Sequence, residues 1–148
     1  MKAFDIEAEN AMHVVDVMNE IGNNYAISSA QIGEVLEKSS SALAVSGDDL
    51  EHVTAMAAAM NEVLQDSSVT GSTLKVVGLR LRGAKTELTE MDEETDGMVT
   101  STSKLRSKIM GLTSVNGKEG FDIMLDAKNF KSTYDIMKGI AEVWDDMS

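Results

Sequence analysis

The sequence contains no cysteine and no proline, and only 4% of its residues are aromatic. The absence of cysteine excludes a disulfide framework and any thiolate nucleophile or metal ligand. The absence of proline leaves only glycine and clusters of serine and asparagine to interrupt long helices. With 148 residues, the chain is long enough for one domain, or for one domain with an appendage. These features favour a helical protein without cysteine chemistry.

Positive charge is also scarce, because 13 lysines and arginines stand against 25 acidic residues and give a net charge of −12. Binding to phosphates requires a cationic surface, so this balance disfavours nucleic acids and anionic membranes as ligands. The most apolar window, residues 53–60, is far shorter than a bilayer span. No secretory signal is predicted, since the first four residues are followed at once by Asp5, Glu7 and Glu9. We therefore expect a soluble, cytoplasmic protein.

The first predicted helix begins at Asp5, which is a candidate N-cap, and ends at about Gly22, before Asn23 and Asn24. Apolar residues recur in it at helical spacing. They predict one buried stripe, which consists of Ala8, Ala11, Met12, Val15, Met18 and Ile21.

Three more helices are predicted in the first half of the chain. Ser28 or Ser29 caps the second helix, Gly47 suits the left-handed position after its end, and Asp48 caps the third. The third helix ends at residues 66–68, and the fourth runs from about Thr70 to Gly83. Their predicted inner faces are, in order, Ile32, Val35, Leu36 and Leu43; Leu50, Val53, Met56, Ala57, Met60, Val63 and Leu64; and Leu74, Val77, Gly78 and Leu81.

The second half of the chain has weaker signals. Residues 86–97 are half acidic and predict a loop or frayed linker, and a helix follows from about Thr100 to Leu112. Residues 121–125 alternate weakly and are the one predicted strand, which must pair either with residues near 112–115 or with another chain. The last predicted helix has Ile140 beside a buried face. That face consists of Tyr134, Met137, Ala141, Trp144 and Met147.

Together these signals predict an all-α fold, a multi-helix bundle or stacked helical hairpins with one short strand or small hairpin near the C-terminal part. The predicted division is a four-helix region at residues 1–85, an acidic linker at 86–99, and a helix, strand and helix at 100–148.

Motifs that resemble ligand sites fail on a required residue. Residues 92–97 begin like a calcium loop, but Ser103 stands where the twelfth position needs a bidentate Glu. Residues 111–119 have the wrong glycine spacing for a phosphate loop, and Glu119 replaces the required hydroxyl. His13 and His52 lack metal-ligand spacing and are predicted to be ordinary surface or boundary residues. We expect no catalytic residue, metal or cofactor, and therefore no enzyme.

Two basic clusters are the candidate interaction surface: Lys75, Arg80, Arg82 and Lys85 in the first, and Lys104, Arg106 and Lys108 in the second. Residues 1–66 contain twelve acids and two bases, so the simplest role of the basic clusters is to neutralise that acidic surface. A small anion site is a less favoured alternative. The same segregation of charge can also act between chains, with the basic surface of one copy against the acidic surface of the next in a head-to-tail arrangement.

Eight segments along the chain carry a family resemblance: His13–Ser29, Ile32–Gly33, Lys38–Ala44, Asn61–Asp66, Gly71–Lys75, Leu79–Gly83, Phe130–Met137 and Trp144–Asp146. Any one of these segments is an ordinary helix pattern, whereas their order and spacing are specific. In this order and spacing, the chain resembles the N-terminal core region of phage tail tape measure proteins.

This resemblance implies a structural protein that lies in the lumen of the virion tail and determines tail length during assembly in the host cytoplasm. Implied partners are the tube, tail assembly chaperones and copies of the chain itself. The chain is much shorter than such proteins, so we expect a fragment, from a phage or a prophage. No catalytic residue of the family is carried over. The alternative is a helical adaptor that binds partner helices through Met-rich grooves.

Overall fold

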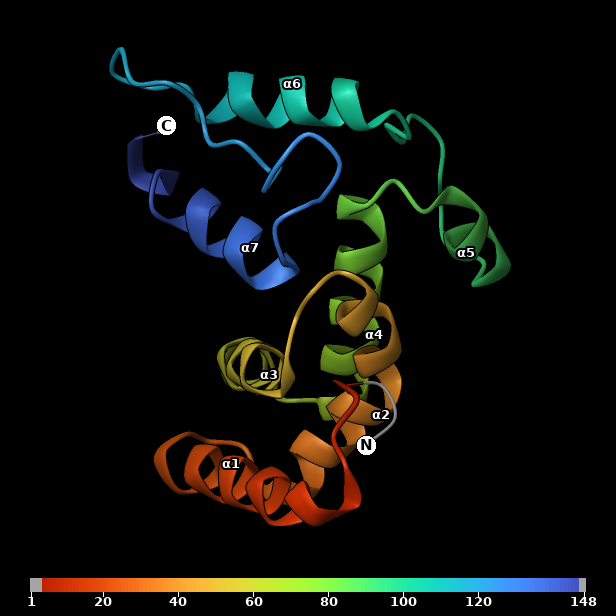
Figure 1. Ribbon diagram of the computed structural model, residues 1–148, viewed down its shortest axis with the longest axis vertical. Helices are drawn as coiled ribbons and strands as arrows, with labels where there is room; N and C mark the ends of the chain where they lie inside the picture. Colours follow the sequence, from red (N-terminus) through yellow and green to blue (C-terminus); the bar gives the residue numbers. More distant parts are fainter. Residues whose placement is uncertain (1–3, 147–148) are drawn as a thin grey trace. The chain divides into compact units, whose positions relative to one another are not determined.

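A computed structural model describes residues 4–146, which divide between Val77 and Gly78 into two compact units (Figure 1). Each unit is described by itself. Residues 4–146 contain α-helices and short 3-10 helices and no strand. The all-α prediction is therefore confirmed, and the predicted short strand is wrong. The three-part division of the sequence stays a prediction.

The first unit contains α1 (Ala11–Asn24), α2 (Ser29–Val45), α3 (Leu50–Leu64) and most of α4 (Ser67–Leu81) (Figure 1). Its core is built mainly from α2 and α3, and Leu74 of α4 is also fully buried. The inner face predicted for α2 is confirmed in full. In α3 the first part of the stripe is buried, but Val63 is 82% exposed and Leu64 is 40% exposed. The stripe therefore loses its cover in the last turn of α3.

Side-chain caps fix the ends of these helices. Ser28 and Gln31 form a reciprocal capping box at the start of α2, as predicted for Ser28. Gly47 has φ +83, the left-handed conformation predicted for it. The cap of α3 is Asp49 rather than Asp48, because the Asp49 side chain accepts the backbone N–H of His52 at 2.8 Å. Residues 66–68 were predicted to end α3, which ends just before them at Leu64; they also start α4 at Ser67, and the Asp66 carboxylate accepts the backbone N–H of Val69.

Helix α1 differs most from its prediction. Asp5 has φ +53 and does not cap the helix, which begins at Ala11 after a 3-10 turn at Ala8–Asn10. Gly22 does not end it, and the helix continues to Asn24. No residue of α1 is buried, and Met12 is 69% exposed. The predicted buried stripe is therefore wrong for the described residues, and the side chain of Ala8 lies outside them.

Helix α4 packs closely on α2. A Cβ on Gly71 would lie 3.0 Å from the Cβ of Lys38, so the glycine permits this approach. Lys38 also bonds to Ser68, and the Ser67 hydroxyl donates to Glu34 at 2.5 Å. The start of α4 is therefore held to α2 by polar contacts as well as by packing.

The second unit contains the end of α4, α5 (Lys85–Glu90), α6 (Thr102–Thr113), α7 (Thr133–Ala141) and a 3-10 turn at Trp144–Asp146. The loop predicted for residues 86–97 is partly wrong, since α5 forms around the fully buried Leu88. Partly buried residues, among them Leu81 and Leu105, pack around the centre of this unit. The centre itself consists of four buried residues: Ile109, Ile123, Met124 and Ile136.

The predicted strand at residues 121–125 is replaced by one antiparallel bridge between Met124 and Phe130. The intervening turn is closed by Asp126, whose carboxylate accepts the backbone N–H groups of Lys128 and Asn129 at 2.8 and 2.9 Å. Pairing stops there because Ser132 already caps α7 by accepting the backbone N–H of Asp135. Within the described residues, the pairing partner is thus residue 130 and not the 112–115 region.

The face of α7 is also corrected. The helix buries Thr133, Ile136 and Gly139, and Tyr134 and Met137 are only half-buried. Because α7 ends at Ala141, the predicted stripe is not continued, and Trp144 is 66% exposed. Met147 lies outside the described residues.

Candidate interaction surfaces

Two arginines of the predicted basic surface, Arg80 and Arg106, are engaged within their own unit. Arg80 Nη2 donates to the backbone carbonyl of Glu94 at 2.8 Å and lies 3.4 Å from the carboxylate of Glu93. Arg106 Nε donates to Asp122 Oδ1 at 2.8 Å, and its Nη2 donates to Asp122 Oδ2. The Arg80 contacts hold the acidic residues Glu93 and Glu94 to the end of α4. The Arg106 contacts hold Asp122, which follows α6 in the chain, to α6.

The lysines of that surface differ in exposure. Lys85, Lys104 and Lys108 are exposed, whereas Lys75 is half-buried on α4. Arg82 is half-buried as well. The structure thus leaves α6 with an exposed pair of lysines one helical turn apart. The interaction role of all seven basic residues stays a prediction.

The Arg106–Asp122 pair shifts the ionisation of both partners. Hydrogen bonds from the guanidinium lower the pKa of Asp122, and the backbone N–H of Met124 acts in the same direction. The same hydrogen bonds raise the pKa of Arg106. The pKa of Asp126 is lowered by its hydrogen bonds from the Asn129 side chain and from the backbone N–H groups of Lys128 and Asn129. These shifts arise from turns and a tether, which are structural contacts.

Replacing Asp122 with asparagine is expected to flatten the dependence of stability on pH in the acidic range. A carboxyl whose folded-state pKa is lowered stabilises the fold above its unfolded pKa, near 3.9, and loses this contribution as the pH falls through the folded pKa. Thermal unfolding followed by circular dichroism from neutral to strongly acid pH measures this change. Asp96→Asn removes one exposed acid outside the pair and is the matched control. Identical profiles for both variants would contradict the prediction.

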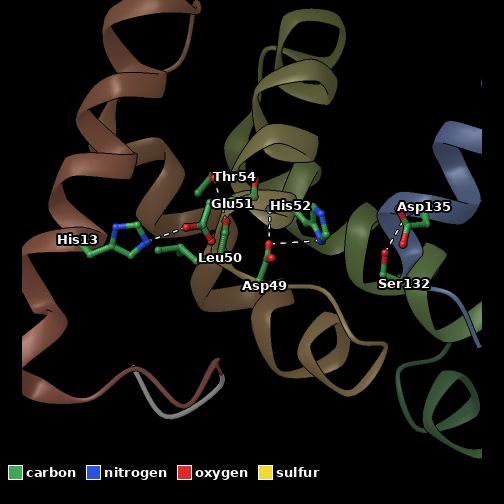
Figure 2. A network of polar contacts seen from close by, with 8 residues as sticks. All are labelled: His13, Asp49, Leu50, Glu51, His52, Thr54, Ser132 and Asp135. Atoms are coloured by element: carbon green, nitrogen blue, oxygen red, sulfur yellow. Dashed lines mark hydrogen bonds and ion pairs between the residues drawn. The ribbon is translucent and has the colours of Figure 1, made fainter. Parts of the chain in front are cut away.

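The two histidines engage separate carboxylates of α3 (Figure 2). His13 Nε2 of α1 lies 2.6 Å from Glu51 Oε1, so this contact joins the two helices. His52 Nδ1 lies 3.3 Å from Oδ1 of the capping Asp49. Within residues 4–146, no cluster of three or more His, Asp or Glu is placed to share a metal ion.

A groove of about 460 Å³ lies between α1 and α3, beside the His13–Glu51 contact. Half-buried Val17 and Ile21 of α1 form its apolar part, and Asp16 and Glu20 expose carboxylates on the same helix face. Glu51 and Thr54 of α3 line the other side. The groove is therefore apolar within and acidic along its edge.

The sequence did not predict this groove, although part of its signal is present. Residues 13, 16, 17, 20 and 21 follow the i, i+3, i+4, i+7, i+8 spacing of one helix face. That face alternates acids with aliphatic residues, which indicates an edge rather than a buried core. The contribution of α3 required the tertiary contact.

Comparison with known proteins gives one clear result. The family model of phage-related minor tail proteins matches residues 1–148 of this chain. No solved structure matches it. In the part of the chain that the structure describes, none of the helices is long and apolar enough to cross a membrane.

Proposed function

The chain belongs to the phage-related minor tail protein family over its whole length, and from this we propose that it acts in the tail as part of the tape measure. The match over residues 1–148 carries the proposal, since it agrees with the specific resemblance of the ordered segments from His13 to Asp146. In this role the chain is a structural element in the tail lumen that sets tail length during assembly in the host cytoplasm.

We propose that the role is non-enzymatic. The ionisable groups with shifted pKa values, Arg106, Asp122 and Asp126, support turns and a surface tether. The histidines contact the neighbouring carboxylates of α3, one of which is its cap. Partners proposed on the resemblance are the tube, tail assembly chaperones and copies of the chain.

The alternative is a helical adaptor that binds partner helices through Met-rich grooves. It has less support, because the groove between α1 and α3 is lined by aliphatic and acidic side chains and by no methionine. Met12 is exposed on α1, but it is not one of the residues that line the groove.

Duplicating residues 1–77 in the encoding phage or prophage tests the length-setting role. A ruler lengthens the tail in proportion to the residues added, by up to about 115 Å if each added residue rises about 1.5 Å as in a helix. Negative-stain electron microscopy of purified tails measures this length. The matched control duplicates the same segment in a gene for a protein outside the tail. Normal tails of unchanged length would contradict length setting while leaving a structural role in the tail.

A further inference from the structure

The groove between α1 and α3 combines two features that suit an incoming helix. Its apolar part contains Val17 and Ile21, neither of which is fully covered by the fold. Its edge holds Asp16 and Glu20, spaced by one helical turn, or about 6 Å along the axis. Glu51 adds a third carboxylate from α3 and is itself 2.6 Å from His13. A complementary helix needs cations one turn apart beside an apolar side chain.

Helix α6 of this chain presents that pattern. Lys104, Lys108 and Leu112 lie at i, i+4 and i+8 and share one helix face. All three are exposed, and Leu112 is 63% exposed. The buried Ile109 and Thr113 lie on an adjoining face of α6, and the lysine face is exposed, so it is not needed for the core. No acid lies in α6 to compete for these lysines.

We propose that the groove between α1 and α3 of one copy binds the Lys104–Lys108–Leu112 face of α6 of a second copy. The two lysines meet Asp16 and Glu20 at matching one-turn spacing, and Leu112 contacts the aliphatic part of the groove. Such a contact joins different surfaces of the two copies, so repetition closes a ring or extends a filament. The inference rests on the proposed function only in that copies of the chain meet in one tail.

Site-specific crosslinking tests the contact cleanly, because the chain has no cysteine of its own. One full-length copy carries Met12→Cys, beside the groove, and a second copy of different tag size carries Ser107→Cys, beside the lysine face. After mixing and mild oxidation, we expect a mixed disulfide on a non-reducing gel. It should decrease strongly at about 1 M salt, where the Debye length is about 3 Å. The control replaces Met12→Cys with Val63→Cys, which is 82% exposed on the same unit.

A charge swap separates a direct contact from an indirect effect on folding. Lys104→Glu with Lys108→Glu in the Ser107→Cys copy should abolish the mixed disulfide. Adding Asp16→Lys with Glu20→Lys to the Met12→Cys copy should restore it, and circular dichroism verifies that each variant is folded. Equal crosslinking by the Val63→Cys control, no mixed disulfide, or no rescue by the swap would overturn the proposal. Tail length enters none of these readouts, so crosslinking with unchanged tails would refute length setting alone.

Discussion

Leu43→Ala is expected to lower the free energy of unfolding by about 2–5 kcal/mol. Leu43 has 0% exposure on α2, within the core that α2 and α3 share, so truncation removes apolar contacts and leaves a cavity. Urea unfolding of the full chain, followed by far-UV circular dichroism, measures the change. A loss of this size is a large part of the stability of an ordinary domain, about 5–15 kcal/mol.

Val45→Ala on the same helix is the matched control for Leu43→Ala. Val45 is 73% exposed, so its replacement removes little buried area, and surface substitutions of this kind usually change stability by less than about 0.5 kcal/mol. Equal losses for the two variants would show that α2 does not pack through the face that contains Leu43. That result would contradict the core of the first unit.

The sequence predicted the buried face of a helix best where a single apolar stripe packs against neighbouring helices. In α2 the residues Ile32, Val35, Leu36 and Leu43 are all buried, because both the spacing and the partner helices are present. In α1 the same kind of spacing misled the prediction. A periodic pattern shows that a helix is amphipathic but does not show which neighbour covers it, and Met12 is left exposed.

Local chemistry decided several smaller differences. Asp48 and Asp49 are both good caps, and the helix start at Leu50 selects Asp49 as the cap. The acidic composition of residues 86–97 hid α5, whose one buried residue is Leu88. Alternation at residues 121–125 suggested a strand, but the cap of α7 at Ser132 follows the Asp126 turn so closely that only one bridge forms.

The candidate surfaces were predicted only in part. Charge alone identified the basic residues, but not which of them would be engaged. Arg80 contacts Glu93 and Glu94, and Arg106 contacts Asp122, at sequence separations of 13 to 16. Only the tertiary structure brings these groups together. The fold, and not the sequence, therefore shows that Arg80 and Arg106 contact acidic residues, whereas Lys104 and Lys108 are exposed.

Two glycines in helices are expected to respond to alanine with opposite signs. Gly111→Ala in α6 should stabilise the chain by up to about 1 kcal/mol, because alanine favours helices and no atom beyond the local helix backbone lies within 4 Å of the added Cβ. Gly139→Ala in α7 gains the same propensity, but its Cβ would lie 2.1 Å from the Phe121 ring. Overpacking of this kind costs about 1–3 kcal/mol or more, so we expect net destabilisation.

A double-mutant cycle with Phe121→Leu shows whether the ring causes the loss at Gly139. Phe121 packs against the core of the second unit, and Lys131 lies 4.4 Å above its ring, so Phe121→Leu alone also destabilises the fold. In the Phe121→Leu background, however, Gly139→Ala should cost less, with a coupling energy of about 0.5–3 kcal/mol. Thermal unfolding of the four proteins of the cycle gives this energy. Additive losses would mean that α7 and residue 121 do not approach closely, because only contact through the ring makes the two substitutions interdependent.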